Sequence, residues 1–230
     1  EDNSASEHVL ALRSGDIKTM TESAKYVHEA IAHELRRVRK GSRGLKSPSS
    51  NVYTYLGAIL DCLACVGSHP DITLNLVSSL HLCAQMGKAV RKYLFASDSL
   101  ALVMKSVKKH KQNPDIVLHG FKFASLLCEH EKKGPLVVRL EGGLKRIIDV
   151  LRHESILQYS SVVTQTLQLA SQLIRKGGWN KVRLLTRNRV SFVKVLLSVG
   201  HFYGNGKMNN EDIGVMMALL PVLERMPTVV

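Results

Sequence analysis

Cys62 and Cys65 are the first residues whose types and spacing could do chemistry. Two cysteines separated by two residues form a zinc half-site or a thioredoxin-like redox pair in other proteins. A zinc site would need a second pair of ligands at comparable spacing, whereas Cys83 and Cys128 each stand alone. All four cysteines fall inside apolar patterns of helical spacing. We therefore expect small core side chains, with no bound metal and no cofactor.

His28 and His33 lie in the stretch HEAIAH, which is one residue longer than the zinc-protease motif HExxH. At about 100° per residue, a step of five residues places the two imidazoles about 140° apart around a helix. Imidazoles this far apart cannot bind one metal ion. We expect both histidines to be solvated or to lie at the rim of a surface.

Gly204, Gly206 and Lys207 match the end of a phosphate-binding loop. That motif needs Ser or Thr after the lysine, where this chain has Met208, and it needs a preceding β-strand, which the pattern does not indicate. We expect residues 200–210 to form a loop between repeats. Because no other group of residues has catalytic spacing, the sequence predicts a protein that is not an enzyme.

The charge of the chain indicates which partners its surface attracts. Among 230 residues, 32 Lys and Arg stand against 19 Asp and Glu, a formal net charge of +13. Such a field favours an acidic peptide, a nucleic acid or a lipid head group. The densest basic cluster has six positive charges in eleven residues. We expect it to be an electrostatic anchor, a nuclear-import signal or a solvated charge run; it comprises Arg36, Arg37, Arg39, Lys40, Arg43 and Lys46.

The composition also bounds the compartment and the fold. Four cysteines do not form a secreted disulfide scaffold, so we expect a reducing compartment, the cytoplasm or alternatively the nucleus. No apolar run approaches the roughly 18 residues of a membrane span. The chain begins without Met or an apolar secretory segment, so we expect an excerpt or a processed product. Hydrophobic residues make up 45% but aromatic residues only 5%, a balance that favours helices packed by aliphatic side chains.

The elements that position these residues are expected to be helices. Between Thr19 and Arg39 the apolar residues recur at steps of four and three, which places them on one helical face. Gly, Ser and Pro residues then interrupt the pattern up to Ser50. We expect a helical N-terminal cap over residues 1–46, with a basic C-terminal stretch, and a repeat array over residues 47–230.

The array repeats its own sequence. HPDI at residues 69–72 recurs as NPDI at residues 113–116, an offset of 44 residues, with Pro in the first helical turn. A second set of apolar positions recurs at offsets of 44 and then 46 residues. A helical period in the forties is typical of a stacked solenoid, in which each unit buries its apolar face against its neighbours. This second set comprises Leu100, Val103 and Val107, then Leu144, Ile147 and Leu151, then Val190, Val193 and Leu197.

Two stretches resemble the armadillo repeat family. LEGGLKRIIDVLRHE, residues 140–154, is similar to that family's short helix, Gly-Gly turn and second helix, and NPDIVLHGFKFASLLC, residues 113–128, is similar to its third helix. The resemblance is clearest over residues 71–199. It implies an all-α, armadillo-like, right-handed superhelical solenoid of about three full repeats, with the N-terminal cap and a partial C-terminal repeat.

The resemblance also implies where a partner binds. In armadillo proteins the third helices lie side by side and line a concave groove that usually holds an extended peptide. The corresponding residues here are expected to contact a partner, with Arg36, Arg37, Arg39 and Lys40 as the electrostatic anchor. The expected groove residues are Asn75, His119, Lys122, Gln165, Gln168 and Gln172.

The resulting prediction is a non-catalytic protein–protein interaction module that binds an acidic peptide or protein segment, as a scaffold or adaptor. Acidic tubulin tails fit this chemistry, as does an acidic motif in a scaffold partner. One alternative is a nucleic-acid-binding helical repeat, because a basic stripe suffices for duplex binding. A second alternative is a self-associating structural segment whose terminal apolar faces are unpaired.

Overall fold

The computed structural model describes residues 3–40, 47–65, 69–176, 189–204 and 209–224, and over these ranges every regular element is a helix. None of the described helices is both long and apolar enough to cross a membrane. The chain divides into two compact units, Glu1–Lys109 and His110–Val230.

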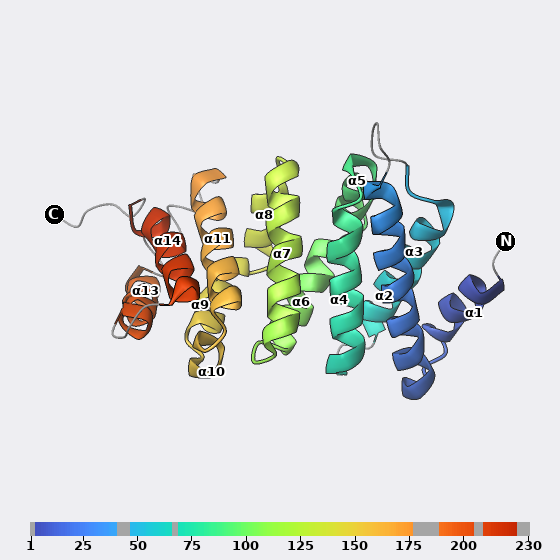
Figure 1. Cartoon of the computed structure of the whole chain (residues 1–230), viewed down its shortest axis with the longest axis horizontal. Coiled ribbons are helices and arrows are strands. Elements are labelled where there is room, and N and C mark those ends of the chain that lie inside the picture. The colour runs from blue at the N-terminus through green and yellow to red at the C-terminus, as the bar shows by residue number, and fades with distance from the viewer. Residues whose placement is uncertain (1–2, 41–46, 66–68, 177–188, 205–208, 225–230) are drawn as a thin grey trace. The chain divides into compact units, whose positions relative to one another are not determined.

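The first unit contains six described helices, with α2 packed along α4 and α3 against both (Figure 1). The sequence predicts α2 well. Asp16 caps the N-terminus by accepting a hydrogen bond from the backbone N–H of Thr19 at 2.9 Å. The residues of its apolar stripe are all buried: Met20, Ala24, Val27, Ile31, Leu35 and Val38. The helices are α1 (Asn3–Ala11), α2 (Ile17–Arg39), α3 (Ser50–Cys65), α4 (Pro70–Ala84), α5 (Lys88–Ala96) and α6 (Ser99–Lys109).

The second unit places α11 between α7 and α14, so that three long helices lie side by side (Figure 1). We call these three helices the helix row. The shorter α8 packs on α7, and α9 packs on α8, α11 and α13. The described helices are α7 (Pro114–His130), α8 (Gly134–Leu140), α9 (Gly143–Leu151), α10 (Glu154–Leu157), α11 (Ser160–Lys176), α13 (Arg189–Gly204) and α14 (Asn210–Glu224).

The turn between α8 and α9 explains the Gly-Gly pair that carries the resemblance. Gly142 has a φ of 72°, in the left-handed region that favours glycine. Gly143 lies so close to α8 that a Cβ atom there would be 2.3 Å from Val138 Cγ1 and 2.7 Å from Val138 O. The two glycines therefore let the short helix fold directly back onto the next one.

The predicted repeat phase is confirmed for two sets of residues and wrong for the third. Leu100, Val103 and Val107 are buried, as are their equivalents in α9. In α13, however, Leu197 is 64% exposed and Val193 is half-buried, while the side chain of Val190 lies outside the described residues. The residues buried instead are 48 positions after those of α9: Phe192, Val195, Leu196 and Val199.

The two-residue difference has a simple geometric reason. Two residues correspond to about 200° around a helix, so the 46-residue offset selects nearly the opposite face of α13.

The predicted loop over residues 200–210 is wrong in its first half, because the α13 helix continues to Gly204. Residues 205–208, which include Gly206 and Lys207, lie outside the described part.

The predicted domain boundary after residue 46 stays a prediction, because residues 41–46 lie outside the described ranges. The division between the compact units instead falls between Lys109 and His110, within the predicted array. The α2 helix contributes to the core of the first unit through its packing on α4.

Candidate functional site

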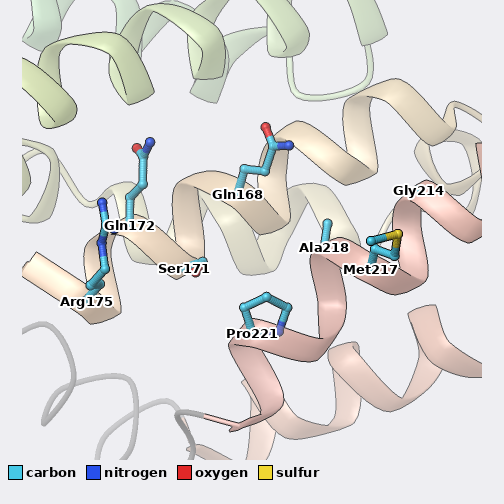
Figure 2. A pocket seen from close by; sticks show the side chains of 8 residues that line it. All are labelled: Gln168, Ser171, Gln172, Arg175, Gly214, Met217, Ala218 and Pro221. Atoms are coloured by element: carbon cyan, nitrogen blue, oxygen red, sulfur yellow. The ribbon is translucent and has the colours of Figure 1, made fainter.

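A hollow of about 460 Å³ lies between α11 and α14 in the second unit (Figure 2). We call it the α11–α14 hollow. From α11 it is lined by Gln168, Ser171, Gln172 and Arg175. From α14 it is lined by Gly214, Met217, Ala218 and Pro221. Two of the predicted groove residues, Gln168 and Gln172, therefore meet here.

The pattern of α11 explains why polar side chains gather in this hollow. Leu167, Leu173 and Ile174 are among the buried residues that hold the helix in the core. Gln168, Gln172 and Arg175 follow one another at steps of four and three residues, which places them on a single face. Figure 2 shows these three side chains projecting from one side of α11, with α14 on the other side of that helix in the view.

One side-chain acceptor on α11 lacks a donor, and α14 lacks one helical hydrogen bond at Pro221. The side-chain oxygen Oε1 of Gln172 is buried and accepts no hydrogen bond. Pro221 lies inside α14 and has no N–H, so it cannot donate the usual helical hydrogen bond to the carbonyl of Met217. A buried acceptor without a donor costs roughly 1–3 kcal/mol. The Gln172 oxygen is covered by protein atoms, so a molecule in the hollow does not reach it.

The charge of the hollow is positive. Arg175 is exposed, and none of the eight lining residues is Asp or Glu. The wall from α14 is apolar, and Met217 is 67% exposed. The arrangement combines an exposed cation with an apolar wall.

Two of the predicted groove residues belong to α7, the neighbour of α11, and a third, Gln165 on α11, has a structural role. His119 and Lys122 are half-buried on α7. The amide nitrogen of Gln165 donates a hydrogen bond to Ser125 Oγ at 2.9 Å, which ties α11 to α7. Lys176 Nζ donates to the carbonyls of Cys128 at 3.0 Å and Glu129 at 2.7 Å, at the C-terminal end of α7.

Asn75 belongs to α4 in the first unit, whereas the other five predicted groove residues belong to the second unit. Its amide nitrogen donates to the carbonyl of Asp71 within the same helix, at 3.0 Å.

Three of the four predicted anchor residues, Arg36, Arg37 and Lys40, line a second hollow at the end of α2, of about 370 Å³, together with His33. We call it the α2 hollow. Arg36 and Lys40 are exposed, and over the described part of the chain their side chains form no salt bridge. Arg39 donates a hydrogen bond to Gln85 Oε1.

Arg37 has a structural role beside its place in the α2 hollow. Its guanidinium donates two hydrogen bonds to the Glu34 carboxylate, both at 2.7 Å, and one to the carbonyl of Ser47 at 2.9 Å. The bond from Arg37 holds the pKa of Glu34 well below its ordinary value, at about 2. The Glu34 carboxylate also accepts from the backbone N–H of Ser49 at 2.7 Å. This pair joins residues 47–49 to α2.

The cysteines and histidines form no metal-binding group among the described residues. All four thiols are free. Cys62 is buried, and burial raises its pKa to about 11. The expectation that both members of the pair are core side chains is wrong for Cys65, which is exposed at the end of α3.

Of the two positions expected for His28, the solvated one is wrong, because its side chain is half-buried and faces α4. Its Nδ1 atom lies 2.9 Å from Ser78 Oγ and 3.2 Å from Ser79 Oγ, within hydrogen-bonding distance of both. His33, five residues later, is exposed as predicted.

Sequence reasoning missed six of the eight residues that line the α11–α14 hollow, among them Arg175, Met217 and Pro221. A proline inside an apolar helical pattern was a usable signal, because it interrupts the hydrogen bonding of the helix. Arg175 was also accessible from the sequence, since it follows Gln172 by three residues on the same helical face.

Comparisons with known structures agree with this architecture. The chain is similar over its whole length to an engineered protein of known crystal structure, with 14% identity, full coverage of that chain and a TM-score of 0.57. It is also similar to a designed armadillo repeat protein, with 11% identity, 94% coverage of this chain, 98% of that one and a TM-score of 0.52. No family model matches the sequence, and no curated protein matches it.

These likenesses define the class of fold. The chain is an all-α solenoid of the armadillo type. Its long helices α7, α11 and α14 correspond to stacked repeat helices, and the short α8 and α9 flank the Gly-Gly turn.

Proposed function

We propose that this chain is a non-catalytic protein-interaction module that binds an acidic segment of another protein on the helix row. One observation carries the proposal: the middle turns of α7, α11 and α14 contain no carboxylate. Acidic residues occur only near the ends of α7 and α14, and α11 has none. Lys122 lies within this stretch on α7, and Arg175 is in the last turn of α11, a helix without carboxylates.

The basic end of α2 supports the same choice of partner. Arg36 and Lys40, beside Arg39, offer a second positively charged contact for an acidic partner in the first unit. The likeness to a designed armadillo repeat protein supports a scaffold or adaptor role, because stacked repeats offer extended binding surfaces. Acidic tubulin tails are one partner of suitable chemistry. The proposal places the module in the cytoplasm, with the nucleus as the alternative compartment.

The test is a competition between two anionic probes on the full chain. A fluorescent peptide rich in Glu and Leu and a random DNA duplex are each titrated while anisotropy is measured. Lys122→Glu should weaken peptide binding and leave duplex binding unchanged. Lys108→Glu, which reverses an exposed charge on α6, is the matched control and should leave peptide binding unchanged. Unchanged peptide binding by Lys122→Glu would contradict the proposed surface.

The nucleic-acid alternative rests on a different surface. Lys105, Lys108 and Lys109 are all exposed on α6, and a basic stripe is sufficient to bind the phosphates of a duplex. If duplex displaces the peptide and Lys108→Glu with Lys109→Glu abolishes duplex binding, this alternative replaces the first proposal.

Self-association has support at the last described helix. On α14, Ile213 is 44% exposed, Leu220 53% and Leu223 40%, beside Met217. Light scattering over a concentration series measures this directly. A mass that rises with concentration, and that Leu220→Glu returns to the monomer value, would favour the structural role.

A further inference from the structure

We propose that Cys62 and Cys65, at the end of α3, form a reversible intrahelical disulfide by exchange with a small disulfide such as glutathione disulfide. Cys65 is the thiol that meets the oxidant. Cys62 is the resolving thiol that completes the disulfide. This modification site is independent of the surfaces proposed above for a protein partner.

The structure gives the two thiols different access to solvent. Cys62 is buried, whereas Cys65 is exposed as the last residue of α3. Both line one hollow of about 340 Å³, together with residues of the connection from α1 to α2, among them Leu12 and Ile17. A small disulfide that enters from solvent therefore reaches Cys65 first.

Helix geometry brings the two cysteines into the range of a disulfide. Residues three apart on an α-helix have Cα atoms about 5 Å apart, within the range of about 4.4–6.8 Å found across disulfides. Their Cβ atoms are about 5–6 Å apart and must approach by about 1–2 Å to reach the usual separation. Cys65 can move because the last carbonyls of a helix have no helical hydrogen bond to lose.

The environment of Cys62 suits the second step and not the first. Burial, and then the neighbouring Cys65, raise the pKa of Cys62 to about 11. Cys62 is therefore a poor nucleophile toward an external disulfide. Once Cys65 carries a mixed disulfide it has no charge, which removes the second of these two causes. A thiol of high pKa is also intrinsically more nucleophilic, and attack within one helical turn gains from proximity.

The exchange balances in two steps. First, the Cys65 thiolate attacks one sulfur of glutathione disulfide, the S–S bond of the oxidant breaks, and one glutathione leaves with the proton that Cys65 released. Second, Cys62 loses its proton and attacks Cys65 Sγ, and the other glutathione leaves with that proton. The cysteine pair gives up two electrons, which reduce glutathione disulfide to two glutathione molecules. Excess glutathione reverses both steps.

The other two cysteines serve as internal references. Cys83 and Cys128 are buried, one in α4 and one in α7. Burial raises the pKa of both thiols. Neither should exchange in the folded chain, because a buried thiol without a charged form is inert.

The test is oxidation of the folded full chain by glutathione disulfide. The reaction is quenched with acid, the chain is unfolded, and the remaining thiols are alkylated and counted by intact mass. The reduced chain has four thiols, and the expected product has only those of Cys83 and Cys128, with no bound glutathione. Proteolytic mapping should place the disulfide between Cys62 and Cys65, and dithiothreitol should restore all four thiols.

Three variants separate the steps. Cys62→Ala should stop at the mixed disulfide, with one glutathione bound to Cys65. Cys65→Ser should slow the loss of thiols from the folded chain at least about tenfold, because the thiols that remain are buried. Cys83→Ala removes a thiol outside the pair and is the matched control, so it should form the Cys62–Cys65 disulfide at an unchanged rate.

Three results would overturn the proposal. A stable mixed disulfide in the unaltered chain would mean that Cys62 does not resolve it. Disulfide-linked dimers through Cys65 would mean that a second copy is the resolving partner. Four unreacted thiols would mean that Cys65 does not meet the oxidant. The unaltered chain decides among these results even if Cys62→Ala does not fold.

Discussion

Replacing Gly143 by Ala tests the packing that joins successive helices of the second unit. The added Cβ would lie 2.3 Å from Val138 Cγ1 and 2.7 Å from the Val138 carbonyl oxygen. Non-bonded carbon atoms prefer about 3.5–4.0 Å. A new rotamer of Val138 relieves the first clash but not the second, because the carbonyl belongs to the backbone. The α8 helix must therefore move away from α9.

The magnitude follows from two opposing effects. Overpacking a well-packed site costs about 1–3 kcal/mol, and a backbone clash belongs at the upper end of that range. Alanine is favoured over glycine in helices by up to about 1 kcal/mol, which offsets part of this cost. We expect a net loss of about 2 kcal/mol. For a chain of this size that corresponds to a fall in Tm of about 4–8 °C.

The assay is urea unfolding followed by far-ultraviolet circular dichroism. Gly57→Ala is the control, because Gly57 lies inside α3 and a Cβ atom added there would have no neighbouring atom within 4 Å. It should stabilise the chain by about 0.5–1 kcal/mol. If Gly143→Ala shifts the urea midpoint in the same direction as Gly57→Ala, the close approach of α8 and α9 is not what requires glycine.

Three further predictions concern ionisation and thiol access. Because Arg37 lowers the pKa of Glu34 to about 2, stability should fall as the pH drops from about 4.5 towards 2, and Glu34→Gln should remove that part of the pH dependence in chemical denaturation. Burial lowers the pKa of His28 from 6.5, so the fold favours the neutral imidazole. The contribution of this residue to the free energy of unfolding should be complete above pH 6.5 and decrease as the pH falls below it. In a His28→Gln variant the free energy of unfolding should depend less on pH in this range. A thiol reagent should modify Cys65 rapidly in the folded chain, and this fast reaction should be absent in Cys65→Ser. Fast modification of a buried thiol in the native state would contradict the packing. The buried thiols are Cys62, Cys83 and Cys128.

Parts of the candidate site were accessible from the sequence. Gln168 and Gln172 were predicted from the resemblance, and both line the α11–α14 hollow. The partners from α14 were missed because the spacing of residues within α11 says nothing about which helix packs beside it. Gln165 shows the same limit, since it shares the polar character of Gln172 but donates a hydrogen bond to Ser125.

The basic cluster at the end of α2 also shows which properties the sequence reveals and which it does not. Its charge was evident from the sequence, but the roles within it were not. Arg37 pairs with Glu34 three residues earlier and with the backbone of Ser47. Arg36, next to it, is exposed. Adjacent residues point about 100° apart on a helix, so one can stabilise the fold while the next remains available to a partner.

The sequence by itself determined the helical character of the chain, the 44-residue offset between its first two sets of apolar positions, and its positive charge. Each depends on local spacing or on composition, and none of them changes when the helices are arranged in space. Only the tertiary structure decided which face of α13 is buried, that Cys65 is exposed, and that Gln168 and Gln172 line one hollow with Met217 and Pro221. The physical reason is that helical periodicity orients a side chain about its own axis, whereas burial and hydrogen bonding depend on the neighbouring helix.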